Sequence, residues 1–285
     1  MSQDRPPEPR REAEAEPDSA ATPAEPTPED FAVWDPGFVP PDPDEPPPVE
    51  LWRAVGDITP WGTLFVLLPC TLLFLVLAVR AHDGWQADLY VWGGNATHLP
   101  LADSSWRVLA SMFLHSGAPH LFFNATTLLL FGPAVERLFT RHAFWVVYAL
   151  GGACASLASL AWRDAHGGGY SVGASGAIFA LAGALLVGAY RLRHRLAVGR
   201  ARSLGAAILY LAGTGFAAGF ARHGTDNVAH AGGLVCGALL ASRLGLRPEL
   251  GGRGAGGFTR ALARVCALAL AAAVAIGVRD GLSVP

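Results

Sequence analysis

Seven long apolar stretches follow one another from Pro60 towards the end of the chain, and they restrict the fold more than any other feature. An α-helix of roughly 20 apolar residues crosses a hydrocarbon core of ~30 Å, and lipid offers no partner for an unpaired backbone group. We therefore expect an all-α, polytopic membrane helix bundle. The expected helices cover residues 60–79, 119–138, 143–161, 171–190, 203–221, 227–245 and 259–278.

The first 50 residues differ in composition from the rest. They contain 14 acidic residues, three Arg and 14 of the 21 prolines, too little apolar surface to offset the entropy of ordering. They also lack a continuous apolar segment behind a basic start, which a signal peptide would need. We expect a disordered, acidic, Pro-rich cytoplasmic tail over 1–50, a membrane core over 51–247, and a basic linker with a seventh helix over 248–285. A tail that docks on a partner is the alternative for 1–50.

Several classes of chemistry have no motif in this chain. The four cysteines each lie inside an apolar run without a C-x-x-C neighbour, which disfavours a disulfide framework and a zinc site. The chain also lacks a phosphate-binding glycine loop and an H-E-x-x-H motif, so we expect neither a metal nor an organic cofactor. The basic residues are scattered among hydrophobic segments, and we expect no nucleic-acid partner.

The arginines predict an orientation. With the N-terminus inside, 16 of the 21 Arg fall in cytoplasmic segments and five fall outside, as the positive-inside rule requires. The C-terminus and the connection over 80–118 are then extracytoplasmic. That connection carries Trp85, Tyr90, Trp92 and Trp106, and such rings favour the membrane interface, so we expect it to lie partly in the outer leaflet. The Ala/Gly-rich, Arg-only composition suggests a bacterial inner membrane.

Four polar residues fall at one depth inside three of these helices. His120 and Asn124 lie one turn apart in the first turns of helix 119–138. Ser175 is expected about five residues into helix 171–190, and His230 about four residues into helix 227–245. The three helices run in the same direction. At 1.5 Å per residue the four side chains therefore share roughly one depth below the outer surface.

The four side chains are the set that acyl transfer needs. A Ser hydroxyl becomes a nucleophile when a neighbouring neutral imidazole accepts its proton, and Ser175 with His230 can form that pair. The backbone N–H of Ser175, the His120 ring and the Asn124 amide can stabilise the oxyanion. Taken singly, a membrane Ser more often bonds to its own helix and an Asn more often joins two helices. One shared site explains all four together.

The motifs around these residues resemble those of the rhomboid intramembrane serine proteases. In chain order they are Trp106-Arg107, His115, His120-x-x-x-Asn124, Glu136-Arg137, Gly173-Ala174-Ser175-Gly176 and Ala229-His230-x-x-Gly233-x-x-x-Gly237. The resemblance covers about residues 60–245. It implies a six-helix rhomboid core, with the seventh helix as in the family's six-plus-one members.

The resemblance also implies a role for each matched residue. Ser175 is the nucleophile, His230 its general base, and His120 and Asn124 belong to the oxyanion site. The remaining matches imply structural support: Trp106 and Arg107 in the outer-leaflet loop, Glu136 and Arg137 on the cytoplasmic side, and the packing residues Gly173, Gly176, Gly233 and Gly237.

Two positions next to the predicted pair need separate mention. Phe179 replaces a Tyr that packs on the catalytic His in some family members, and it keeps the ring face without the hydroxyl. Asp226 lies four residues before His230 and is a candidate third member of a triad, whereas the resemblance implies a Ser-His dyad.

The implied function is serine endopeptidase activity on transmembrane segments of other membrane proteins, near the extracytoplasmic face and through an acyl-enzyme. Two alternatives stay open. In the first, the chain is a rhomboid-like protein that binds transmembrane segments without cleaving them. In the second, it is a transporter that uses His120, Asn124 and His230 as a polar path. The oligomeric state is not predicted.

Overall fold

The computed structural model describes residues 58–80, 85–193, 200–221 and 226–283. The chain divides into two units, 1–47 and 48–285, and all described residues belong to the second. The tail expected over 1–50 lies outside the described residues.

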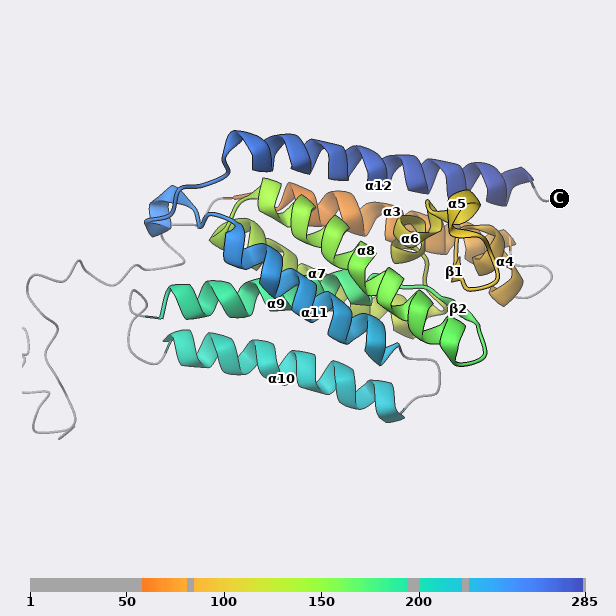
Figure 1. Ribbon diagram of the computed structural model, residues 1–285, viewed down its shortest axis with the longest axis horizontal. Coiled ribbons are helices and arrows are strands. Elements are labelled where there is room, and N and C mark those ends of the chain that lie inside the picture. Colours follow the sequence, from red (N-terminus) through yellow and green to blue (C-terminus); the bar gives the residue numbers. More distant parts are fainter. Residues whose placement is uncertain (1–57, 81–84, 194–199, 222–225, 284–285) are drawn as a thin grey trace, which may run out of the picture. The chain divides into compact units, whose positions relative to one another are not determined.

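The described part of the chain is an all-α membrane helix bundle with seven long helices, as the sequence predicted (Figure 1). Every helix boundary lies within five residues of its expected position. The helices are α3 (Trp61–Arg80), α7 (Ala118–Leu138), α8 (Arg141–Ala165), α9 (Ser175–Arg191), α10 (Arg200–Ala221), α11 (Asn227–Arg243) and α12 (Gly257–Ser283).

Three of these helices, α3, α8 and α12, are long and apolar enough by themselves to cross a membrane. Helix α9 and residues 205–217 of α10 are apolar but shorter. Helices such as α9 and α11 are rich in Gly and Ala because they pack against other helices, and small residues allow that close approach.

The connection between α3 and α7 is built of short elements. It contains α4 (Trp85–Val91), β1 (Asn95–Ala96), α5 (Leu101–Ser104), α6 (Arg107–Ala110) and the 3₁₀ turn η1 (Ser111–Phe113). Strand β1 pairs antiparallel with β2 (Tyr170–Ser171), with Asn95 opposite Ser171. The prediction of helix from residue 171 was therefore wrong, because Ser171 lies in this pair and Gly173 has a φ of +125°.

Helix α9 is the centre of the bundle. Twelve of its 17 residues are buried, and it packs against α11, α8, α7 and α10. In Figure 1, α12 and α10 lie along opposite sides of the bundle; α12 contacts α8, and α10 contacts α9. Ser175 is the first residue of α9. The candidate serine therefore lies on the helix that the other helices enclose most.

A buried carboxylate joins α7 to the start of α3. Glu136 is 1% exposed, and its Oε1 accepts hydrogen bonds from the backbone N–H (2.9 Å) and hydroxyl (2.8 Å) of Thr63. Its Oε2 accepts the N–H of Gly62 at 3.1 Å. The N–H groups of a first helical turn have no acceptor within the helix, and a negative charge there is stabilised by the helix dipole. Glu136 thus caps α3 from another helix, in the last turns of α7 and away from His120.

Helix α12 packs against the connection between α3 and α7 through Trp92, which lies against two glycines of α12. The ring of Trp92 is 5% exposed, and a Cβ built on Gly281 of α12 would overlap it. A Cβ on Gly277 would lie 2.5 Å from the Trp92 carbonyl oxygen. These contacts give the Ala-rich helix α12 a packing role.

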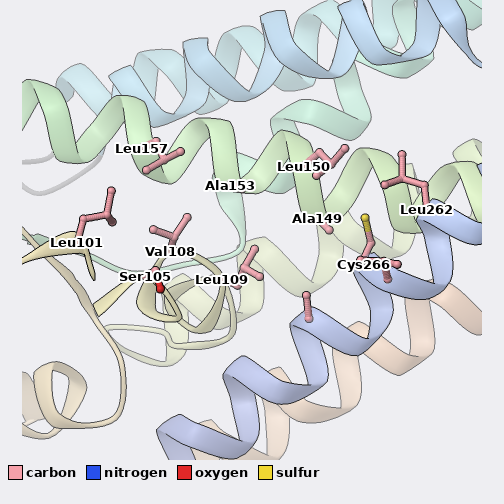
Figure 2. A pocket seen from close by; sticks show the side chains of 12 residues that line it. Leu101, Ser105, Val108, Leu109, Ala149, Leu150, Ala153, Leu157, Leu262 and Cys266 are labelled. Carbon is pink, nitrogen blue, oxygen red and sulfur yellow. The ribbon is translucent and has the colours of Figure 1, made fainter. Parts of the chain in front are cut away.

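An apolar cavity of about 390 Å³ lies between α12, α8 and the α5–α6 segment (Figure 2). Leu109, Leu150 and Cys266 line it, and Ser105 supplies a hydroxyl. Ser175, His230, His120 and Asn124 do not line it. The cavity is therefore separate from the four polar residues that the sequence predicts at one depth.

We expect Glu136→Gln to lower the free energy of unfolding by about 2–3 kcal/mol, because it removes the charge from hydrogen bonds with three buried donors. Thermal unfolding of the purified protein in detergent measures the loss. Glu249→Gln is the matched control, since Glu249 is exposed in the 3₁₀ turn η2 (Pro248–Leu250). Equal melting temperatures for the two variants would contradict the capping role.

Candidate active site

The starts of α7, α9 and α11 meet at one place. Ser175 is the first residue of α9, and His230 is the fourth residue of α11. The Oγ of Ser175 and the Nε2 of His230 are 2.9 Å apart, within hydrogen-bonding distance. His120, in the first turn of α7, lies beside Gly173, two residues before the serine. The structure thus brings together the residues that the sequence placed at a common depth.

Ser175 does not lie about five residues into its helix, as the sequence suggested; it begins the helix. The N–H groups of a first helical turn have no intrahelical acceptor and carry the positive end of the dipole, a good setting for a developing anion. At 1.5 Å per residue the 17 residues of α9 span about 26 Å, less than the ~30 Å hydrocarbon core. If Arg191 at the other end reaches one interface, Ser175 lies below the opposite one.

Two aromatic rings enclose His230. The Phe179 ring, one turn after Ser175, stacks on the imidazole with centroids 4.2 Å apart and planes 12° apart. The Phe216 ring of α10 meets the imidazole edge-on at 5.8 Å and meets Phe179 at 5.0 Å. Together the rings restrict the orientation of His230. Sequence reasoning missed Phe216, because it is one apolar residue among many in its helix.

Hydrogen bonds at the start of α7 determine which nitrogen of His120 carries its proton. The Nδ1 of His120 lies 3.4 Å from the backbone N of Ser116 and 2.9 Å from its Oγ. Since a backbone N–H only donates, Nδ1 accepts and Nε2 carries the proton. A Cβ built on Gly173 would lie 2.7 Å from both Nε2 and Cε1 of His120, so this edge of the ring faces the chain before Ser175. Ser116 precedes the helix by two residues, and its role was not predicted.

Asn124 is buried one turn further along α7. Its amide nitrogen donates to the carbonyl oxygen of His120 at 2.9 Å and lies 3.9 Å from the position of a Cβ on Gly173. One of its two amide hydrogens is therefore engaged within its own helix, and the other is available to the space beside Gly173.

His115 lies in contact with His120, and both of its ring nitrogens are buried. Their ring centroids are 5.2 Å apart in an edge-on arrangement. Burial lowers the pKa of His115 to about 3, with a smaller effect from His120. The His115 ring is therefore neutral at physiological pH and adds no charge beside His120.

Asp226 contacts several groups, but not the imidazole four residues later. One carboxylate oxygen, Oδ1, accepts the N–H of Ala229 at 3.0 Å and so caps α11. The other, Oδ2, accepts from Ser159, from Ser171 at 3.0 Å, and from the Nη2 of Arg163 at 3.2 Å. The Nδ1 of His230 is buried with no hydrogen-bond partner among the described residues. The geometry therefore supports a dyad and not a triad.

Asp226 is ionised at neutral pH. Burial by itself raises the pKa of this carboxyl. Hydrogen bonds from Ser159 and Ala229, the charge of Arg163 and the Ser171 hydroxyl outweigh that effect, and the pKa lies below the ordinary value of 3.8.

Glycines allow α9 and α11 to approach until their backbones touch. A Cβ built on Gly233 would overlap the carbonyl oxygen of Gly176, and one on Gly237 would overlap that of Ala180. A Cβ on Gly176 would lie 2.6 Å from the Cβ of Ala155 in α8 and 3.7 Å from the carbonyl oxygen of Ala229 in α11. No larger residue fits at Gly233 or Gly237 without separating the helices that carry Ser175 and His230.

The other residues assigned to structural support lie away from the dyad. The guanidinium of Arg107 lies over the rings of Trp106 (4.7 Å) and Tyr90 (5.1 Å) and donates to the carbonyls of Tyr90 and Gly94. These contacts join the start of α6 to α4 and to the chain that follows α4. Arg137 lies in the last turn of α7, next to the capping residue Glu136.

The chain belongs to the rhomboid family, since residues 102–247, half of its length, match the Rhomboid domain. It is an integral membrane protein. It is 34% identical over 208 residues to the protein named Rhomboid protease GluP from Bacillus subtilis, covering 73% of this chain and 38% of GluP. It is 27% identical over 207 residues to Rhomboid protease AarA from Providencia stuartii, covering 66% of this chain and 73% of AarA. The chain thus spans well under half the length of GluP.

We expect Gly173→Ala to slow covalent modification of Ser175 by a fluorophosphonate about 10- to 100-fold, because a Cβ at this position displaces the His120 ring and strains a left-handed backbone. The measurement is the rate of labelling in detergent. Gly167→Ala is the matched control, since Gly167 also has a positive φ, of +98°, but nothing lies within 4 Å of its Cβ position. Equal slowing in both variants would indicate backbone strain alone.

Proposed function

We propose that this protein is an intramembrane serine endopeptidase that cleaves transmembrane segments of other membrane proteins near the extracytoplasmic face. The observation that carries the proposal is the 2.9 Å contact between the Ser175 hydroxyl and the His230 imidazole at the start of a buried helix. Membership of a family with relatives named as proteases supports the same activity.

In the first half of the reaction the peptide bond is broken. The Oγ of Ser175 attacks the scissile carbonyl carbon while the Nε2 of His230 accepts the hydroxyl proton. The carbonyl oxygen becomes an oxyanion beside the N–H of Ser175, the Nε2–H of His120 and the free amide hydrogen of Asn124. When the tetrahedral intermediate collapses, His230 returns the proton to the departing amine and leaves an acyl-enzyme on Ser175.

In the second half a water molecule hydrolyses the acyl-enzyme. His230 accepts a proton from the water, which attacks the ester carbon, and the same oxyanion donors act again. The ester bond breaks, the proton passes to the Ser175 oxygen, and the dyad is restored. Each half needs one neutral imidazole, and the rings of Phe179 and Phe216 keep that imidazole oriented.

The substrate segment must unwind before it can react. The carbonyl of a helical peptide bond is shielded by its own hydrogen bond, so we expect small or helix-breaking residues near the scissile bond. We also propose an orientation with the N-terminus cytoplasmic and the C-terminus extracytoplasmic, and residence in a bacterial inner membrane. The Arg distribution supports the orientation.

The two alternatives predict other results. A non-catalytic binder of transmembrane segments has no need of a serine hydroxyl hydrogen-bonded to an imidazole, yet this chain contains that pair. A transporter needs polar groups that continue across the membrane. Below Ser175, the buried positions of α9 are Ala, Gly, Leu, Ile and Phe, which disfavours such a path.

Ser175→Ala and His230→Ala should each abolish fluorophosphonate labelling and lower cleavage of a transmembrane test substrate by about a thousand-fold or more, since either change removes one member of the dyad. Labelling on a gel and cleavage in proteoliposomes measure the two effects. Ser242→Ala and His166→Ala, both exposed and outside the site, should leave both readouts unchanged.

The outcomes separate the alternatives. Absence of labelling and cleavage in folded wild-type protein would favour the binder. Cleavage retained by Ser175→Ala would remove Ser175 as the nucleophile. Solute flux abolished by His230→Ala, without proteolysis, would favour the transporter.

His120→Ala and Asn124→Ala should lower kcat about 100- to 1,000-fold with a much smaller change in KM, because their hydrogen bonds form with the oxyanion and not with the ground-state carbonyl. Steady-state cleavage of a transmembrane substrate gives both constants. Thr127→Ala is the control, because Thr127 is half-buried on the same helix and its hydroxyl donates to the Phe123 carbonyl of that helix. A rise in KM at constant kcat would instead place His120 or Asn124 in substrate binding.

A further inference from the structure

Asp226 lies where three parts of the site meet, at the start of α11, the end of α8 and the segment that leads into Ser175. Its side chain is 12% exposed, and its carboxylate accepts hydrogen bonds from residues on all three. The donors on α8 are Ser159 and Arg163, one turn apart. A single side chain therefore connects elements that are 55 to 67 residues apart in sequence.

The residues bonded to Asp226 lie close in sequence to Ser175 and His230, and the intervening segments are held by further hydrogen bonds. Ser171, a donor to Oδ2, precedes Ser175 by four residues, and the intervening chain is held by β1 and by the hydrogen bond from the Gly173 N–H to the Ser111 carbonyl at 2.9 Å. Ala229, whose N–H is bonded to Oδ1, immediately precedes His230. A shift of the carboxylate would thus move Ser175 and His230 relative to each other.

The charge of Asp226 makes these bonds strong. Hydrogen bonds to an ionised acceptor are roughly twice as strong as neutral ones, and the ion pair with Arg163 lies in a largely buried setting. Asp226 is not bonded to His230, so it does not act on the basicity of the imidazole through a hydrogen bond.

From this geometry we infer that Asp226 is a positioning residue: its carboxylate holds the serine-bearing segment, the end of α8 and the histidine-bearing helix in the register that the Ser175–His230 contact requires. The inference rests on the proposed function, because positioning matters where the pair reacts. The effect belongs in the rate of the chemical step, since a displacement of 1 Å at a reacting pair costs about 100-fold.

Asp226→Ser separates positioning from helix capping, because Ser is also a good N-cap residue but carries no second oxygen or charge for Ser159, Ser171 and Arg163. We expect the first-order rate constant for fluorophosphonate labelling of Ser175 to fall about 10- to 100-fold, with the probe's dissociation constant nearly unchanged. The end-point fraction labelled should stay that of wild type. Asp164→Asn, an exposed carboxylate next to Arg163, should behave as wild type.

The pairing with Ser171 is tested by a double-mutant cycle. Ser171→Ala should slow labelling in the wild-type background and have little further effect in Asp226→Ser, because the partner is already gone. If Asp226→Ser fails to fold, Ser171→Ala and Ser159→Ala test the same contacts by smaller changes.

Three results would overturn the inference. The first is an unchanged rate constant in Asp226→Ser. The second is a loss confined to the labelled fraction, which indicates only a structural role. The third is a rate constant that returns to the wild-type value at a shifted pH, which would indicate that the Asp226 charge acts only on the imidazole.

A failure of the proposed function gives a different pattern. If folded wild-type protein is not labelled, the dyad is unreactive and the cycle is measured in melting temperatures. If the changes in melting temperature caused by Asp226→Ser and Ser171→Ala are additive, the contact between Asp226 and Ser171 does not hold the two segments in register. Coupled changes would support that role.

Discussion

The close approach of α9 and α11 is the constraint on which the rest of the site depends. Backbone touches backbone where Gly233 faces Gly176 and where Gly237 faces Ala180. In lipid, helices associate through van der Waals contact more than through expulsion of water, and the absence of side chains permits the closest contact. The 2.9 Å separation of Ser175 and His230 follows from that approach, because each residue lies in the first turn of its helix. The enclosing rings of Phe179 and Phe216 then restrict the imidazole.

Two carboxylates stabilise opposite ends of the bundle by the same physical means. Glu136 caps the start of α3 from the end of α7, and Asp226 caps α11 while binding donors from α8 and the segment before Ser175. A buried charge is costly unless hydrogen bonds satisfy it, and here each carboxylate has three or more donors. The hydrogen bonds of these two carboxylates fix the depth of one helix relative to another. Contacts between apolar helix faces alone would determine that depth only weakly.

Much of the fold could be predicted because lipid restricts the choice of structure. Apolar length identified the seven helices to within five residues, and the depth of His120, Asn124, Ser175 and His230 indicated a common site. The start of α9 was predicted four residues early, because hydropathy does not reveal the pairing of Ser171 with Asn95 or the left-handed φ of Gly173. The contacts of Ser116 and Phe216 were missed for a related reason: neither residue has a local pattern that names its partner.

The sequence by itself determined the order of the seven long helices, the family resemblance and the chemical types gathered at one depth, because hydrophobic length and periodic small residues are local properties. Only the tertiary structure decided how those groups meet. It set Ser175 at a helix start, turned the protonated nitrogen of His120 towards Gly173, and directed Asp226 to Ser159, Ser171 and Arg163 instead of His230. These choices depend on side-chain directions between segments up to 67 residues apart, which no local spacing specifies.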